Sequence, residues 1–224
     1  MTINIERRQF NPSLPLIERI LESRGLTPEK LDFGLKGLAS YSNLKGIGEA
    51  CELLFDAIES RKRILIVGDF DADGATSTAL AVDCLKKMGA HWVHYLVPNR
   101  FEYGYGLSEA ITDLAHKEFN PDLLVTVDNG ISSFEGVNRA KQLGMKVLVT
   151  DHHLAAGPSE DDLPKADAIV NPNQPNCQFE SKSACGCAVI FYVLCALRAH
   201  LIKQGIDQVS LPNMASYLDL VALA

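Results

Sequence analysis

Acidic residues crowd into one short segment in the first third of the chain. Asp69, Asp71 and Asp73 lie within five residues of one another, and Gly74 follows them directly. Without a counterion, three such carboxylates would repel one another and take up protons, so a bound cation is the economical explanation. A solvated acidic turn is the plain alternative for this segment taken alone, because Asp and Gly are ordinary turn residues.

Two better-known motifs do not fit this segment. A phosphate-binding loop needs a Lys directly before its Ser or Thr, and no Lys precedes Thr76. An EF-hand loop needs a bidentate Glu at its twelfth position, where this chain has Leu80, and a helix in front where this chain predicts a strand.

Two further polar clusters each follow an apolar run. The segment VDNG contains Asp128, and the segment TDHH contains Asp151, His152 and His153. Carboxylate and imidazole ligands suit Mn²⁺ or Mg²⁺, with Mn²⁺ favoured by the imidazole. The number of carboxylates is sufficient for two ions, and a two-metal site activates a water and holds a phosphate for in-line attack. The predicted reaction is therefore phosphoester hydrolysis.

The elements that carry these clusters have an alternating pattern. From Arg63 onward, the short apolar runs ILIVGDF, WVHYLV, LLVTVD and KVLVTD are separated by stretches with helical spacing, and AIVNP follows after a loop. This rhythm predicts an α/β fold, with a parallel β-sheet flanked by helices. The carboxyl ends of parallel strands open on one edge, so the clusters spread over residues 69–153 should converge there.

Other parts of the chain define its predicted organisation. Residues 1–60 read as an N-terminal helical extension, with Gly25 ending one helix, and residues 61–224 read as the catalytic domain. Residues 183–199 predict a buried helix, and residues 211–224 begin another that has no cap, which suggests a chain cut inside this helix.

Bulk properties narrow the class of protein. The net charge of -7 and the pI near 5.4 argue against a uniformly basic nucleic-acid coat, but not against a local basic groove. The start lacks an apolar leader, and the apolar run 184–197 is shorter than the roughly 20 residues of a membrane span. We therefore expect a cytoplasmic protein without membrane contact.

Six cysteines occur without regular spacing, which is typical of reduced cytoplasmic thiols rather than of a disulfide framework. A zinc cluster of four of them is disfavoured, because its C-x-C pair lacks the usual C-x2-C spacing. The four are Cys177, Cys185, Cys187 and Cys195.

The three polar motifs together resemble those of the DHH phosphoesterases. They are DxDxxG after the first strand, VDNG after the third and DHH itself after the fourth. Longer segments, among them VGDFDADGATSTAL, YLVPNRFEYGYGLS and the final LDLVALA, are similar to the bacterial RecJ exonucleases. The similarity extends over roughly residues 10–224. It implies that residues 61–224 are a DHH catalytic domain binding two ions, Mn²⁺ or Mg²⁺.

The resemblance also implies roles for the acidic residues. Asp71 and Asp73 are implied metal ligands, with Asp69 as a further ligand or a nearby acid. Asp128 is implied as the carboxylate that bridges the two ions. Asp151 is implied as a catalytic-site group that orients a neighbouring ligand.

The two histidines receive different implied roles. His152 is an implied metal ligand, and His153 is placed by the resemblance at the scissile phosphate, where it could steady charge in the transition state.

The segment PNRFEYGYG carries the implied nucleic-acid contacts. Arg100 is expected to bind a 5'-phosphate, although a surface Arg in a turn is the plain alternative. Tyr105, and Tyr103 beside it, could stack on bases, although core packing is the commoner fate of a Tyr. Gly104 and Gly106 permit close approach of the strand or simply form a turn.

The activity implied is a processive 5'-to-3' exonuclease on single-stranded DNA in recombination and repair. A helicase and a single-strand-binding protein are implied partners by analogy. The open alternatives are a DHH phosphodiesterase on oligoribonucleotides or cyclic dinucleotides and a non-catalytic nucleic-acid-binding module.

The chain also departs from the family pattern. Residues 184–188 are less glycine-rich than usual, and Tyr103 stands where an acidic residue is common. The family's fourth motif, which supplies another aspartate just after LDLVALA, and its C-terminal domain are expected beyond the end of the chain. The isolated piece could therefore be inactive.

Overall fold

Two parts of the chain form separate units, one ending at Leu38 and the other running from Ala39 to Ala224. This computed structural model describes residues 11–25 and 37–224, and the first unit contributes helix α1 (Leu16–Ser23). Helix α2 (Ile47–Glu59), assigned above to the extension, buries its apolar face against β5 (Ala168–Val170) and α7 (Gly186–Lys203) of the second unit. Within the described residues, α2 thus belongs with the sheet.

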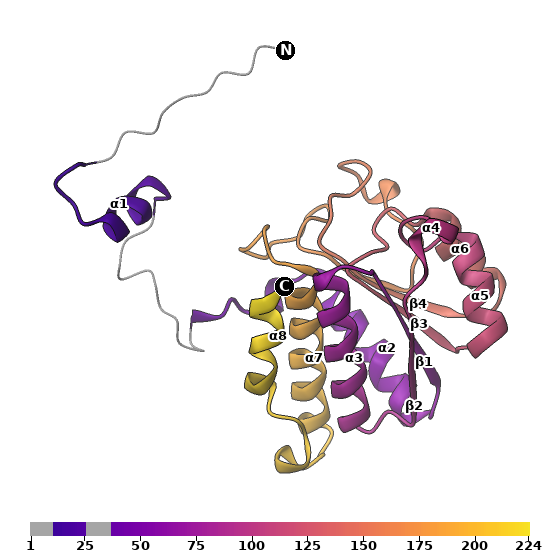
Figure 1. Cartoon of the computed structure of the whole chain (residues 1–224). Helices are drawn as coiled ribbons and strands as arrows, with labels where there is room; N and C mark the ends of the chain where they lie inside the picture. Colours follow the sequence, from indigo (N-terminus) through magenta and orange to yellow (C-terminus); the bar gives the residue numbers. More distant parts are fainter. Residues whose placement is uncertain (1–10, 26–36) are drawn as a thin grey trace, which may run out of the picture. The chain divides into compact units, whose positions relative to one another are not determined.

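A five-stranded sheet forms the centre of the second unit (Figure 1). All neighbouring strands pair in parallel, in the order β2-β1-β3-β4-β5. This confirms the predicted parallel α/β fold. The strands are β1 (Arg63–Gly68), β2 (Trp92–Leu96), β3 (Leu123–Val127), β4 (Lys146–Thr150) and β5 (Ala168–Val170).

Helices cover both faces of the sheet, because successive strand residues point to opposite sides. Ile64 and Ile66 of β1 join the core on one face, and Leu65 and Val67 join the core on the other. The first face packs against α2, α3 (Ala72–Lys87) and α7 (Gly186–Lys203), and α8 (Leu218–Leu223) packs in turn on α3 and α7. The second packs against α5 (Glu109–Phe119) and α6 (Phe134–Gln142). A short helix, α4 (Arg100–Tyr103), lies between β2 and α5 in the chain.

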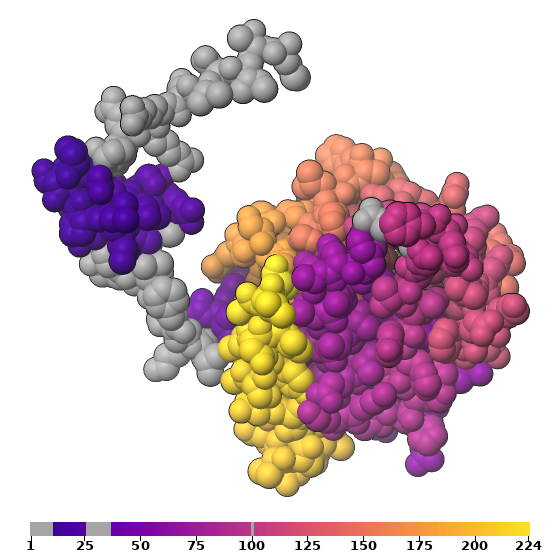
Figure 2. Space-filling view, viewed as in Figure 1, coloured from indigo at the N-terminus to yellow at the C-terminus, as the bar shows by residue number. Residues whose placement is uncertain are grey.

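Helix α7 has the length and apolar composition of a membrane span, and 67% of it is buried inside the protein. Its contacts with α3 and α2 make it the central helix of the first face. The C-terminal segment, yellow in Figure 2, lies along the surface of α3. Tyr217 anchors this segment by donating a hydrogen bond of 2.6 Å to the carboxylate of Asp83 on α3.

The strand order places a topological switch between β1 and β3. The chain moves outward from β1 to β2, then returns across β1 to place β3 on its other side. At such a point, the connections after the two strands leave in opposite directions and open a crevice at their carboxyl ends. The segments after β1 and β3 are the predicted DxDxxG and VDNG motifs, so the fold brings them together.

Candidate metal centre

The turn after β1 is built around carboxylates that bind backbone N–H groups. Asp71 is the N-cap of α3, and its Oδ1 accepts a hydrogen bond of 2.9 Å from the N–H of Gly74. The Oδ1 of Asp69 accepts one of 2.7 Å from the N–H of Phe70. Gly74 is required for close packing, because a Cβ there would collide with the backbone of Asp69. The turn therefore holds its acidic side chains at the sheet edge.

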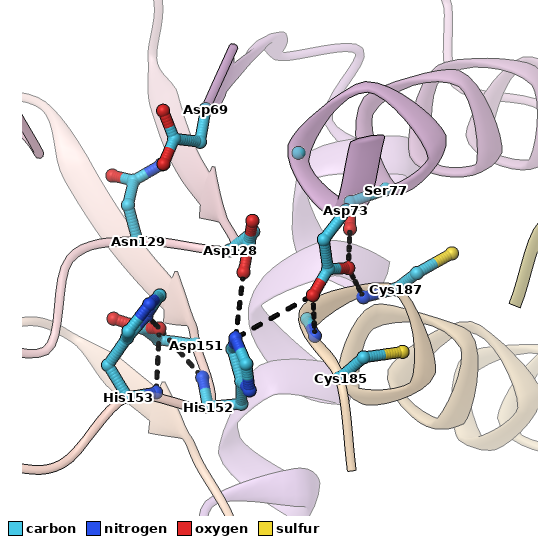
Figure 3. Close-up of polar contacts among 12 residues, drawn as sticks. Asp69, Asp73, Ser77, Asp128, Asn129, Asp151, His152, His153, Cys185 and Cys187 are labelled. Atoms are coloured by element: carbon cyan, nitrogen blue, oxygen red, sulfur yellow. Dashed lines mark hydrogen bonds and ion pairs between the residues drawn. The ribbon is translucent and has the colours of Figure 1, made fainter. Parts of the chain in front are cut away.

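Asp128, directly after β3, is buried in an unusual backbone conformation. It is 1% exposed and has a φ of 62°, and its N–H donates to the carbonyl of Thr150 over 3.0 Å. The Nε2 atom of His152 lies 3.1 Å from its Oδ1 (Figure 3), yet this oxygen has no well-formed hydrogen bond among the described residues. A buried carboxylate oxygen without a hydrogen-bond partner is suited to bind a cation.

The raised pKa of Asp128 also supports a cation ligand at this position. Burial raises the pKa of this carboxyl to about 6; His152 opposes the rise, and Asp73 and Asp71 add to it. The interaction is mutual, because the Asp128 carboxylate beside its ring raises the pKa of His152 against the effect of its own burial. A cation beside Asp128 would remove the cost of keeping it ionised there.

Asp151, directly after β4, is equally buried, but both of its carboxylate oxygens accept hydrogen bonds. Its Oδ2 accepts the N–H of Ile131 over 2.8 Å, and its Oδ1 accepts the N–H groups of His152 and His153 over 2.7 and 3.1 Å. The same Oδ1 lies 2.7 Å from the ring Nδ1 of His153. Burial disfavours the ionised form, but these hydrogen bonds outweigh it and lower the pKa of Asp151.

Two asparagines after β5 donate side-chain hydrogen bonds to the backbone of the DHH turn. Asn171 donates to the carbonyl of His153 over 3.0 Å, and Asn173 donates to the carbonyl of His152 over 2.6 Å. Neither asparagine was predicted from the sequence to have a role. A signal was present, because the segment NPN directly follows the last predicted strand.

The side chains form two groups that could each hold a cation. Ligand atoms of Asp69, Asp71 and Asp128 lie within 4.8 Å of one another, and so do those of Asp128, His152 and His153. Asp128 belongs to both groups. Hard carboxylate oxygens with imidazole nitrogens form a donor set that suits Mn²⁺ and Mg²⁺, so the residues present fit the expected ions.

Asp73 lies at the side of these groups. Its Oδ2 is 3.6 Å from the Nε2 of His152, and its two oxygens accept the N–H groups of Gly186 and Cys187 at the start of α7 (Figure 3). Gly186 was not singled out from the sequence. No local pattern could reveal it, because its importance depends on where α7 docks.

The predicted nucleic-acid contacts are only partly visible. The hydroxyl of Tyr105 lies 3.3 Å from the Nε2 of His153, and its ring is half exposed. Tyr103 instead packs partly against the second core, and Gly104 and Gly106 both adopt positive φ angles. The side chain of Arg100 lies outside the described part of the structure.

The cysteines are free thiols, and none of them belongs to a possible metal group among the described residues. Cys187 is buried in the first core, and Cys185 caps α7. Burial raises the pKa of the Cys187 thiol to about 11, which disfavours the thiolate that zinc requires.

Comparison with known families identifies the domain. Residues 63–224 match the family model described as the DHH family, N-terminal domain. The chain belongs to the DHH family. Among curated DHH relatives, the single-stranded-DNA-specific exonuclease RecJ of Escherichia coli (strain K12) is 49% identical over 213 residues. That match covers 93% of this chain and 36% of the relative. The RecJ of Bacillus subtilis (strain 168) is 37% identical, over 93% of this chain and 26% of its own.

Solved DHH structures agree with this assignment. A crystal structure of exonuclease RecJ bound to manganese has a TM-score of 0.66 and 36% identity, over 80% of this chain and 42% of its own. RecJ of Thermus thermophilus in complex with Mn²⁺ has a TM-score of 0.62 and 34% identity, over 80% of this chain and 23% of its own. The chain thus spans 36% and 26% of the lengths of the two curated relatives named here, and the resemblance to RecJ is confirmed.

Proposed function

We propose that this chain provides the metal-binding part of a single-stranded-DNA-specific exonuclease that hydrolyses phosphodiester bonds with two divalent cations. The observation that carries the proposal is the position of Asp128. It is buried at the switch point, and its carboxylate belongs to both possible cation groups. A carboxylate shared in this way is typical of a two-metal centre, in which paired ions lower the pKa of a water and clamp a phosphate.

Different residues of the chain are proposed as ligands of the two ions. Asp69, Asp71 and Asp128 would hold one ion, and Asp128 with His152 would hold the second, with Asp73 beside it. We count Asp73 as a ligand despite its N–H partners, because a carboxylate oxygen has lone pairs for both.

His153 is the proposed phosphate contact. Asp151 holds the Nδ1 side of its ring, which leaves Nε2 toward Tyr105 and the open edge of the site. Hydrogen bonding to Asp151 raises the pKa of His153 despite its partial burial, which favours a protonated ring. A positioned imidazolium can stabilise negative charge on a phosphate oxygen or a leaving oxygen. Tyr105 and Arg100 would contact the strand itself.

The choice of substrate rests on the relatives. Those proteins are named as exonucleases specific for single-stranded DNA, and we extend both the activity and the substrate to this protein. The 5'-to-3' direction, the place in recombination and repair, and a helicase and single-strand-binding protein as partners extend the family resemblance further. A cytoplasmic location agrees with the six free thiols.

The test is a degradation assay with the natural protein at its full length. A 5'-phosphorylated, 3'-labelled single strand is incubated with Mn²⁺, beside its duplex form and beside the variant Asp128→Ala. We expect stepwise loss from the 5' end that requires both metal and Asp128 and spares the duplex. As a matched control, Asp113→Ala removes an exposed aspartate on α5 that belongs to neither possible cation group, and it should keep full activity.

The alternatives predict other outcomes. Hydrolysis of oligoribonucleotides or cyclic dinucleotides, with no action on long single strands, would replace DNA as the substrate and keep the two-metal chemistry. Metal-independent binding of single strands without any hydrolysis would instead indicate a non-catalytic module.

A further inference from the structure

The first turn of α7 touches two carboxylates of the candidate metal centre from one side. The N–H of Gly186 donates to Oδ2 of Asp73 over 2.7 Å, and the N–H of Cys187 donates to Oδ1 of Asp73 over 2.6 Å (Figure 3). These N–H groups have no partner inside their own helix, and the positive end of the helix dipole favours an anion there. Asp73 is therefore fixed to the start of α7.

Gly186 also lies against Asp128. A Cβ built on Gly186 would lie 2.5 Å from Oδ1, 2.7 Å from Cβ and 2.8 Å from Cγ of Asp128. The φ of Gly186 is not in the left-handed region, and the residue is already helical, so its backbone conformation does not require glycine. What requires glycine is the close approach of the Asp128 side chain.

Neither Asp128 nor the start of α7 can move away from this contact without disturbing the packing around it. Asp128 is 1% exposed at the end of a central strand, and its N–H is bound to the carbonyl of Thr150. Helix α7 is wedged into the first core, where it packs against α2 and α3. Packed interiors absorb an extra methyl only by moving side chains or backbone.

We propose that Gly186 is a positioning residue, which sets the separation between the carboxylates of Asp73 and Asp128 by binding one and leaving room for the other. This inference rests on the proposed two-metal function only where it concerns the ions. The start of α7 is then a fourth segment that borders the site, although it lies far from the three motifs in sequence. A side chain at position 186 would push Asp128 out of the place that both cation groups share.

The contact itself is tested without any metal. The melting temperature is measured in chelator for the natural chain, Gly186→Ala, Asp128→Gly and the double variant. Asp128→Gly removes the colliding side chain, including its Cβ, and suits the positive φ of 62°. We expect Gly186→Ala to lower the melting temperature in the natural background and to have little effect beside Asp128→Gly.

Each outcome of this double-mutant cycle either supports or overturns the contact between Gly186 and Asp128. If Gly186→Ala alone does not fold, rescue by Asp128→Gly supports the contact, and failure of rescue overturns it. An equal loss in both backgrounds, or no loss in the natural one, also overturns it.

The consequence for the ions is tested by titrating Mn²⁺ calorimetrically into Gly186→Ala. The matched control is Gly48→Ala, a helical glycine on α2 whose added Cβ meets nothing within 4 Å. We expect Mn²⁺ affinity to fall about 10- to 100-fold for Gly186→Ala, the usual effect of losing support behind a ligand, and to be unchanged for Gly48→Ala.

Equal Mn²⁺ affinity in Gly186→Ala and the natural chain would overturn the positioning role. If the natural chain bound no Mn²⁺ at all, the proposed metal function would fail instead, and the stability cycle would still decide the contact.

Discussion

The ends of β3 and β4 carry two aspartates that differ in partners rather than in burial. Asp128 and Asp151 are each 1% exposed. Four hydrogen-bond donors surround Asp151 and lower its pKa, whereas burial and neighbouring carboxylates raise the pKa of Asp128 to about 6. Burial alone therefore does not tell a structural carboxylate from a metal-binding one. The number of donors already in place does.

The largest expected difference between the two aspartates is in metal affinity. Asp128→Asn should weaken Mn²⁺ binding by more than about 100-fold, which exceeds the usual effect of losing a group behind a ligand. Asp151→Asn should weaken binding within about 10- to 100-fold, because it only disturbs the support of the DHH turn. Calorimetric titration with Mn²⁺ measures both. Equal losses would contradict the distinction.

The second difference concerns the pH dependence of stability. The folded pKa of Asp128, about 6, lies above its ordinary value, so the folded state holds a proton that the unfolded chain releases. The free energy of unfolding of the metal-free protein should therefore fall by about 3 kcal/mol in all as the pH rises from below about 4 to above about 6. The raised pKa of His152 extends the fall to higher pH. Asp151, with its lowered pKa, acts oppositely and loses its contribution as the pH falls.

Urea unfolding in chelator at several pH values measures this slope. Asp128→Asn should flatten it, and Asp151→Asn should leave this part of it in place. A slope that survives Asp128→Asn would assign it to other groups.

A third difference is expected in the stability of the metal-free protein at neutral pH. Asp151→Ala leaves the buried N–H of Ile131 without its acceptor, at a cost of about 1–3 kcal/mol. Asp128→Ala strands no such donor and should stabilise the metal-free protein by removing a buried charge. Urea unfolding compares the two variants, and a larger loss for Asp128→Ala would reverse the interpretation.

The smallest effect is expected beside these aspartates, at Tyr105. Tyr105→Phe removes a hydroxyl 3.3 Å from His153 and keeps the half-exposed ring. We expect a rate loss below about 10-fold, because a single exposed hydrogen bond contributes about 1 kcal/mol. Single-turnover hydrolysis by the full-length protein measures it. Tyr105→Ala should lose more if the ring stacks on a base.

Local sequence determined the class of fold and the composition of the site. Short apolar runs alternating with helical stretches specify parallel strands, and such strands place their carboxyl ends at one edge, which is why DxDxxG, VDNG and DHH could be expected together. The helix cap at Asp71 was not predicted, because the sequence singled this residue out only as a metal ligand.

Tertiary structure decided which carboxylates are free to bind a cation. The four donors around Asp151 come from the DHH turn and from Ile131, whereas Oδ1 of Asp128 has no hydrogen-bond partner among the described residues. The grouping of α2 with the sheet and the close approach of Gly186 to Asp128 also depend on how distant segments pack. Sequence spacing fixes which residues reach the edge of the sheet, because strand geometry is local. It does not fix their partners there, because those partners arrive on other elements of the fold.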